Sequence, residues 1–213
     1  DHFLTYTDTY AHHLERLEWC FEMGKRVGAA CLRIFPFRLE KGEITGRSVK
    51  TVVSDIAEKL AGPVRRAEHQ RLPLVIENCP FSYLPRGIMT FHLLCVVGNP
   101  YLKLLWDVGN SFHSMGYEWV QEYSDASLVE EYQMIRSHIL NIHVKDLKRG
   151  QGKEYRPVVL RSGDIPYREI FALLKGDCYA HFVTGEPELY DYEGISQSVQ
   201  ALKDLARNLE EKA

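Results

Sequence analysis

The sequence predicts an α/β fold, specifically a TIM (β/α)₈ barrel that lacks its first strands in this chain. Short apolar runs alternate with segments of helical spacing, and strands separated by helices form a parallel sheet. The runs at residues 72–78 and 101–107 are apolar almost throughout, as is typical of strands buried on both faces. Because no G-x-G-x-x-G segment follows any run, an open dinucleotide-binding sheet has no support.

Hydrophobic spacing and breaker residues place the elements in order along the chain. The expected strands are residues 29–35, 72–78, 101–107, 139–144 and 179–184. The expected helices are residues 9–27, 48–70, 83–97, 117–137, 165–174 and 195–209. Gly28 and Gly98 end two helices, Ser48 can cap the second, and Gly62-Pro63 can kink or split it. Residues 149–166 form a long insertion with a short extended piece at 157–160.

The number of strands is too small for a closed barrel. A complete barrel has eight strands and about 250 residues, whereas this chain of 213 residues begins on a helix and has five expected strands. Residues 1–213 are therefore interpreted as a single barrel domain that is N-terminally incomplete. The first strands are missing either from this chain alone or from the protein, or a partial barrel has its open edge at residues 29–35 covered by another copy.

Four of the apolar runs end in a residue that can bind a metal ion. These residues are Glu77, Asp107, His143 and Glu186. The intervals between them are close to the length of a strand, a crossover helix and the next strand, so a repeated βα chain brings all four to the same rim. Three carboxylates and an imidazole suit a divalent cation such as Mn²⁺, Mg²⁺, Co²⁺ or Zn²⁺. Trp106 has the opposite strand parity to Asp107 and is expected to pack against helices.

Composition and charge exclude several functional classes. The net charge of −3 and the pI near 6.3 give no basic field for nucleic acid or an acidic membrane surface. No apolar run approaches the roughly 20 residues of a membrane span, and the first eight residues lack the pattern of a signal peptide. Five widely spaced cysteines, without a C-x-x-C pair, are typical of reduced thiols. We therefore expect a cytoplasmic protein with neither nucleic acid nor membrane as its partner.

The ordered strand ends resemble the xylose isomerase-like TIM barrel superfamily of sugar phosphate isomerases, epimerases and AP endonuclease 2-like enzymes. The segments that carry the resemblance are L-R-I-F (32–35), V-I-E-N (75–78), W-D-V-G-N (106–110), I-H-V-K-D (142–146), S-G-D-I-P-Y (162–167) and T-G-E-P-E (184–188). The resemblance implies that Glu77, Asp107, His143 and Glu186 bind one divalent metal ion. It also implies that the missing strands precede residue 1.

The resemblance further implies a two-base proton transfer, because ketose 3-epimerases use two metal-bound glutamates from opposite faces of the substrate. Glu77 and Glu186 match those catalytic residues. Arg149 matches the family's H-x-x-x-x-x-R arginine, which holds one end of the substrate, and Lys145 shares the strand parity of His143. Asn110 and Arg33 complete the candidate substrate-binding residues, although Arg33 can instead pair with a neighbouring acid in the barrel wall.

Several positions depart from the family's pattern or leave alternatives open. Asn110 replaces the histidine of D-x-x-H, which argues against a trinuclear zinc nuclease, and Tyr83 replaces a glutamate that epimerases carry after the first one. Glu188 rivals Glu186 as a ligand, because Pro187 obscures the strand end. His113 lies just beyond the aspartate strand and either lines the site or has no role in it.

We interpret the chain as a metal-dependent sugar or polyol isomerase or epimerase that moves a proton next to a carbonyl. The first alternative is a lyase of the same fold, such as an inosose or 3-dehydroshikimate dehydratase. The second is a non-catalytic sugar-binding barrel, or a truncated chain that cannot assemble its site. The expected partner is a small sugar or polyol. A homo-oligomer remains an option because such barrels are commonly dimers or tetramers, although no sequence feature marks an interface.

Overall fold

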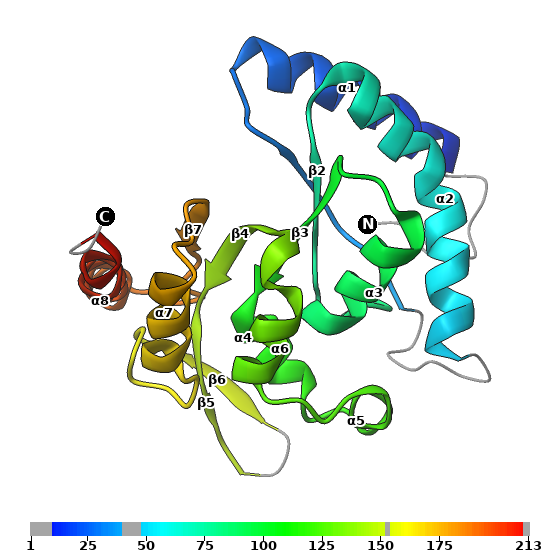
Figure 1. Cartoon of the computed structure of the whole chain (residues 1–213). Helices are drawn as coiled ribbons and strands as arrows, with labels where there is room; N and C mark the ends of the chain where they lie inside the picture. Colours follow the sequence, from blue (N-terminus) through cyan, green and yellow to red (C-terminus); the bar gives the residue numbers. More distant parts are fainter. Residues whose placement is uncertain (1–9, 40–47, 152–153, 211–213) are drawn as a thin grey trace. The chain divides into compact units, whose positions relative to one another are not determined.

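The computed structural model describes residues 10–39, 48–151 and 154–210, drawn in Figure 1. Contacts along the chain divide it into two compact units, Asp1–Leu105 and Trp106–Ala213. Five parallel strands occur among the described residues, and they are the five that the sequence predicts. Whether residues 1–213 are a single domain stays a prediction.

The described residues of the first unit form three helices and three parallel strands. In chain order they are α1 (Tyr10–Arg26), β1 (Leu32–Ile34), α2 (Val49–Gln70), β2 (Leu74–Glu77), α3 (Gly87–Val97) and β3 (Leu102–Asp107). Leu32 pairs with Leu74, and Leu74 pairs with Leu102, so β1, β2 and β3 run in register. β2 is buried along its whole length, which fits the apolar sequence of its first three residues. The last two residues of β3 belong to the second unit.

Helix α2 is continuous through Pro63, so the sequence-based option that Gly62-Pro63 splits it is wrong. Proline lacks an N–H, which leaves the carbonyl four residues earlier without its helical partner. That carbonyl belongs to Lys59, and it accepts a hydrogen bond from the Tyr10 hydroxyl of α1. The predicted cap is confirmed, because Ser48 Oγ accepts a hydrogen bond from the backbone N–H of Thr51 at 3.2 Å.

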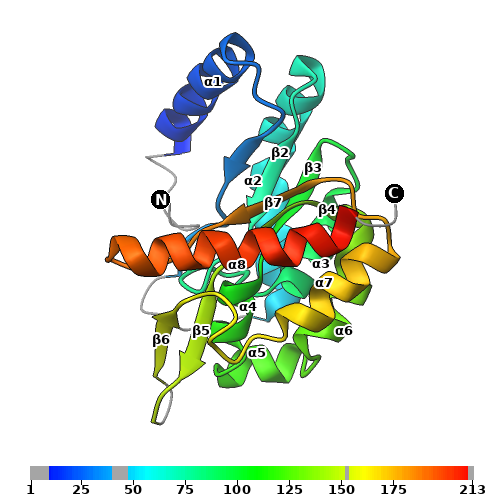
Figure 2. The ribbon, with the colours of Figure 1, turned by 90° about the vertical axis from the view of Figure 1, so that its left-hand side faces the viewer.

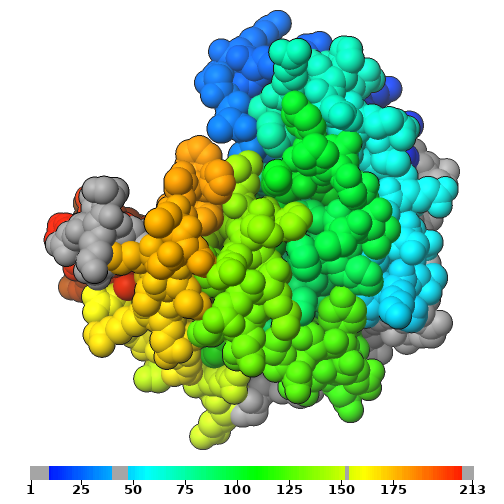
Figure 3. All heavy atoms as spheres, in the orientation of Figure 1, coloured from blue at the N-terminus to red at the C-terminus, as the bar shows by residue number. Residues whose placement is uncertain are grey.

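Among its described residues, the second unit has one parallel strand pair, one hairpin and several helices. In chain order its elements are α4 (Val108–Ser114), α5 (Glu118–Tyr123), α6 (Leu128–Ile135), the 3₁₀ turn η1 (Arg136–His138), β4 (Ile139–Val144), β5 (Asp146–Arg149), β6 (Tyr155–Val158), α7 (Tyr167–Gly176), β7 (Phe182–Gly185) and α8 (Tyr192–Glu210). β4 and β7 are parallel, with His143 paired to Thr184. β5 and β6 are antiparallel. α8 packs against α7 and β7 (Figure 2), and α6 and α7 form much of this unit's face in Figure 3.

One expected helix of this unit is divided in the structure, and other elements were not predicted. The single helix expected at residues 117–137 is two helices, because a capping box starts α6 afresh. Ser127 N–H donates to Glu130 Oε2 at 2.8 Å, and Glu130 N–H donates to Ser127 Oγ at 3.2 Å. The insertion after His143 forms the β5–β6 hairpin, and α4, which follows Asp107 directly, was not predicted. No helix among the described residues has both the length and the apolar character of a membrane span.

Gly163 allows the segment after the hairpin to pack against β5. The backbone N–H groups of Arg161 and Gly163 donate to Asp146 Oδ2 at 2.8 and 2.9 Å. A Cβ at Gly163 would collide with Asp146 Oδ1 and would lie 2.5 Å from the Leu147 carbonyl oxygen. Gly163→Ala is therefore expected to lower the free energy of unfolding by about 2 kcal/mol or more, as overpacking against backbone does.

Urea denaturation of Gly163→Ala and of a glycine control measures this effect. The control is Gly62→Ala, because Gly62 lies inside α2 with nothing within 4 Å of the added Cβ. The control should be neutral or gain about 1 kcal/mol from the better helix former. If both substitutions leave stability unchanged, the segment around Gly163 is not packed as described.

Candidate metal centre

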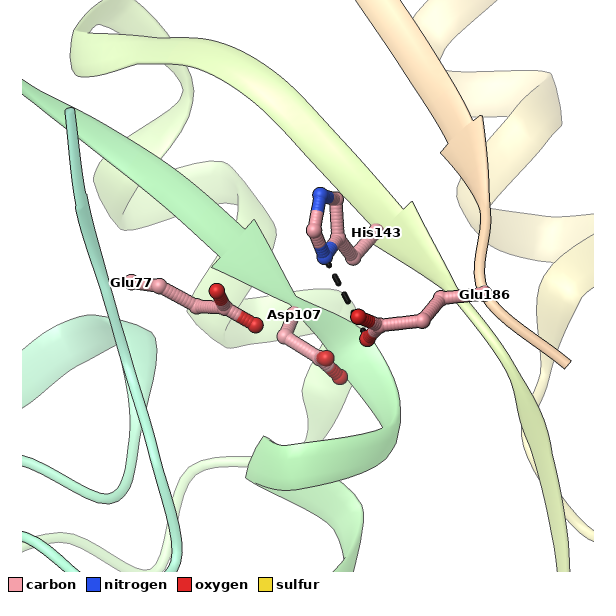
Figure 4. Close-up of side chains that lie close together, drawn as sticks. All are labelled: Glu77, Asp107, His143 and Glu186. Carbon is pink, nitrogen blue, oxygen red and sulfur yellow. Dashed lines mark ion pairs between the residues drawn. The ribbon is translucent and has the colours of Figure 1, made fainter. Parts of the chain in front are cut away.

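Three potential metal ligands of the second unit lie close together (Figure 4). Asp107 ends β3 and is fully buried, and His143 lies near the end of β4. Glu186 follows the last residue of β7, and its N–H donates to the Val144 carbonyl at 2.9 Å, so the strand pairing continues to this position. Because Thr184 is paired with His143, Glu186 emerges two residues later on the same face of the sheet.

The donor atoms of these three residues face one another. One ligand atom of each lies within 4.8 Å of the others, and His143 Nδ1 is 3.3 Å from Glu186 Oε2. The hydrogen bond with His143 lowers the pKa of Glu186 to about 2 against the opposing effect of burial, and the Lys145 charge lowers it further. Glu186 is therefore a negatively charged carboxylate at neutral pH.

Asp107 has a second role, because it caps the N-terminus of α4. Its Oδ1 accepts a hydrogen bond from the backbone N–H of Asn110 at 2.8 Å. This bond fixes the carboxylate and leaves Oδ2 as the oxygen that faces a cation, since Lys145 Nζ lies 3.0 Å from Oδ2. Asn110 thus contacts Asp107 through its backbone N–H, and the Asn110 side chain is buried.

Lys145 contributes a buried positive charge to this acidic group. Its side chain is 6% exposed, and its Nζ lies 3.0 Å from Asp107 Oδ2, 3.4 Å from Glu186 Oε2 and 2.7 Å from Glu188 Oε1. Burial lowers the pKa of Lys145, but the carboxylates of Asp107 and Glu188 more than offset it, so the net pKa is raised. Lys145 is therefore an ammonium ion with three carboxylates around it.

Two residues that the sequence reasoning did not single out hold Lys145 in place. The Tyr167 hydroxyl donates to the Lys145 carbonyl at 2.6 Å and accepts from its N–H at 3.1 Å. The Lys145 side chain runs past Gly109, where an added Cβ would collide with Lys145 Cγ. Both belong to segments quoted from the sequence, S-G-D-I-P-Y and W-D-V-G-N, but their roles depend on spatial contacts that spacing does not reveal.

The remaining sequence candidates occupy other positions. In the first unit Glu77 ends β2 and is buried, and Arg33 Nη1 lies 3.1 Å from Glu77 Oε2. This contact is the acid pairing that was one of the two alternatives for Arg33. In the second unit Arg149 ends β5, and its guanidinium lies 5.1 Å from the centre of the Phe112 ring.

His113 is part of α4 rather than a loop. Its ring centre is 4.9 Å from that of Tyr155 in β6. Burial lowers the pKa of His113, and the nearby Glu188 opposes that shift. His113 is therefore neutral and lies near the Glu188 side chain. The sequence had left open whether His113 lines the site.

The chemistry of the three donors fits a divalent cation. Mg²⁺, Mn²⁺ and Zn²⁺ bind oxygen and nitrogen at about 2.0–2.2 Å and Ca²⁺ at about 2.3–2.6 Å, so donors around one ion lie at most about 4–5 Å apart. The separations of 4.8 Å or less between the ligand atoms of Asp107, His143 and Glu186 are near that limit. The mixture of oxygen and nitrogen donors does not select one metal.

Nearly the whole chain matches one protein-family model. Residues 5–211 match the model described as xylose isomerase-like TIM barrel. The chain belongs to the xylose isomerase-like TIM barrel family. The resemblance inferred from the strand ends is confirmed, and so is the fold class, an α/β barrel of the TIM type.

Several solved structures share the fold of this chain at low sequence identity. IolI protein with a binding zinc atom has a TM-score of 0.75 and 14% identity, covering 98% of this chain and 75% of that chain. The probable 3-DHS dehydratase AsbF from Bacillus anthracis has a TM-score of 0.73 and 16% identity, covering 95% and 73%. A D-tagatose 3-epimerase-like protein has a TM-score of 0.72 and 17% identity, covering 100% and 76%. No curated protein matches the sequence.

Proposed function

We propose that this xylose isomerase-like barrel is a metal-dependent isomerase or epimerase of a small sugar or polyol. The observation that carries the proposal is the convergence of Asp107, His143 and Glu186, whose donor atoms lie within 4.8 Å of one another. Two carboxylates and an imidazole held this close form a donor set that divalent cations bind, and the single positive charge of Lys145 does not balance the three carboxylates around it. The IolI protein, whose solved structure shares this fold, has a binding zinc atom, which supports a divalent metal ion here.

Glu77 is the proposed fourth ligand. It pairs with Leu105 in the β2–β3 register, and β3 continues for two residues beyond Leu105 to end in Asp107. Paired residues of parallel strands share a face, and so do residues two apart in one strand, so this register favours a common direction for Glu77 and Asp107. Arg33 would then serve as the positively charged neighbour of the Glu77 carboxylate, 3.1 Å from Oε2.

The proposed chemistry is the transfer of a proton at a carbon next to a carbonyl. A bound divalent cation would polarise the carbonyl oxygen and stabilise the charge that develops there. Glu77 and Glu186 supply carboxylates that remove and return the proton from opposite faces of the substrate. Glu186 is deprotonated at neutral pH, as a proton acceptor must be. Lys145, Arg149 and Asn110 are proposed to bind hydroxyl groups of the substrate.

Replacing either proposed base should remove turnover. In the full-length gene product, Glu77→Gln and Glu186→Gln are each expected to lower kcat by at least about 100-fold, the scale of general acid–base catalysis. The measurement is a screen of ketoses, inososes and 3-dehydroshikimate in D₂O, with deuterium incorporation read by mass spectrometry. Glu169→Gln is the matched control, because Glu169 is exposed on α7.

The screen also separates the alternatives. Deuterium in recovered sugar without loss of water indicates an isomerase or epimerase, whereas loss of water indicates a dehydratase, the activity named for the AsbF structure. Full turnover by either glutamine variant would contradict the two-base mechanism. If no divalent ion binds at all, a non-catalytic barrel becomes the better interpretation, because the acidic cluster would then have no cofactor.

A further inference from the structure

The contacts of Lys145 coincide with the oxygens that a metal ion would use. Asp107 Oδ1 accepts a hydrogen bond from the Asn110 N–H, and Oδ2 of the same carboxylate lies 3.0 Å from Lys145 Nζ. On Glu186 the same Oε2 atom faces both His143 Nδ1 at 3.3 Å and Lys145 Nζ at 3.4 Å. An ammonium ion and a divalent cation that share these oxygens repel each other, so each weakens the binding of the other.

Glu188 offers Lys145 an alternative partner outside the ligand group. Its Oε1 lies 2.7 Å from Nζ, which is the shortest of the three carboxylate contacts. Glu188 does not belong to the cluster of potential metal ligands among the described residues. A small movement of Nζ away from Asp107 and Glu186 that keeps its contact with Glu188 would therefore make room for a cation at the two ligands and keep the buried ammonium paired. Without Glu188, the same movement would leave a buried charge poorly compensated.

Gly109 fixes the route by which the Lys145 side chain reaches these carboxylates. An added Cβ would collide with Lys145 Cγ and would lie 3.1 Å from Cε and 3.2 Å from Cδ. The stem of the lysine therefore lies against the first turn of α4, which Asp107 caps. The Tyr167 hydroxyl holds the Lys145 backbone from the other side. Movement of Lys145 is thereby restricted to the end of its side chain.

We propose that Lys145 is a built-in competitor of the divalent cation for Asp107 and Glu186, and that Glu188 sets the metal affinity by taking over its ammonium. Lys145 and Glu188 are positioning residues in this proposal, because they act through the two ligands. The inference rests on the proposed function only in that a divalent cation binds to this centre. It adds that metal occupancy and the position of the Lys145 ammonium are coupled.

The test is isothermal titration with Mn²⁺ of the wild type, Lys145→Met, Glu188→Gln and the double variant. Lys145→Met should raise the Mn²⁺ affinity by about tenfold, because the competing charge is gone. Glu188→Gln should lower the affinity by about threefold or more, because Lys145 then relies on Asp107 and Glu186. In the double variant the effect of Glu188→Gln should largely disappear, and this non-additivity is the signature of the proposal.

Two further variants separate the proposal from a general effect of charge. Lys148→Met removes a positive charge from an exposed residue of strand β5, which follows Lys145, and should leave the affinity unchanged. Gly109→Ala changes no charge but displaces the Lys145 stem, so it should raise the affinity in the manner of Lys145→Met. If Gly109→Ala fails to fold, the Lys145 and Glu188 cycle still decides the question.

A thermal melt in EDTA provides a readout that needs no substrate. Lys145→Met should lower the Tm of the protein in EDTA, since three carboxylates lose their common counter-ion, and Mn²⁺ should restore it. Binding of Mn²⁺ with the same affinity in all variants would overturn the inference and leave the proposed function intact. Failure of the wild type itself to bind any divalent cation would overturn both.

Discussion

Asp107→Asn is expected to lower the affinity for Mn²⁺ by at least about 100-fold while the protein remains folded. Loss of a residue that only orients a metal ligand already costs about 10–100-fold, so loss of a ligand's charge should cost at least as much. The fold should tolerate the change, because Asn caps helices as well as Asp does. An asparagine Oδ1 can still accept the 2.8 Å hydrogen bond from Asn110 N–H at the start of α4.

Titration with Mn²⁺ and thermal melts of two Asp107 variants distinguish the two roles of this residue. Asp107→Ala should lose both metal binding and the cap, and the lost cap should cost about 1 kcal/mol of stability. Asp164→Asn is the matched control, because Asp164 Oδ2 accepts the Arg149 N–H at 2.8 Å outside the ligand cluster. Unchanged Mn²⁺ affinity in Asp107→Asn would remove Asp107 from the metal centre.

The sequence could predict the candidate ligands because of a property of parallel strands. Parallel strands end at the same edge of the sheet, so a polar residue at the end of an apolar run is expected at that edge. His143 and Glu186 follow this rule through the β4–β7 register, and Asp107 follows it as the last residue of β3. The family model confirms the barrel class that the same pattern predicts.

The contacts around Lys145 could not be predicted in this way. Glu188 meets Lys145 after a proline that interrupts strand periodicity, and Gly109 matters only because a lysine stem from another element passes over it. Such contacts depend on side-chain rotamers and on the path of a loop, neither of which has a period in the sequence. The break between α5 and α6 was missed for a related reason, since a local capping box overrode a helical pattern.

For Trp106, strand parity predicted the direction of the side chain but not its hydrogen-bond partner. Strand parity predicts that it points away from Asp107 toward helices, and it is fully buried, with Nε1 donating to Glu131 Oε1 of α6 at 2.8 Å. Ser111 Oγ of α4 donates to the same carboxylate oxygen at 2.6 Å. A buried acid on α6 thus ties β3 to two helices just behind Asp107, which links the stability of this unit to the orientation of a candidate ligand.

Trp106→Phe is accordingly expected to lower the free energy of unfolding by about 3–4 kcal/mol. Part of the loss is the donor to a buried carboxylate, about 1.5–3 kcal/mol, and the rest is the cavity left by the smaller ring. Urea denaturation followed by circular dichroism measures it. Trp19→Phe is the matched control and should cost less than about 0.5 kcal/mol, because Trp19 on α1 is 61% exposed.

A double-mutant cycle with Glu131→Gln isolates the hydrogen bond from the packing. The glutamine carbonyl can still accept from Trp106 and Ser111 but carries no charge, so losing the indole donor costs less in that background. We expect a coupling free energy of about 1–2 kcal/mol between the two substitutions. Strict additivity would mean that Trp106 stabilises this unit through ring packing alone, with its ring 5.9 Å from that of Tyr132. The link between α6 and the strand that carries Asp107 would then be apolar, and Glu131 would have no part in holding the candidate ligand.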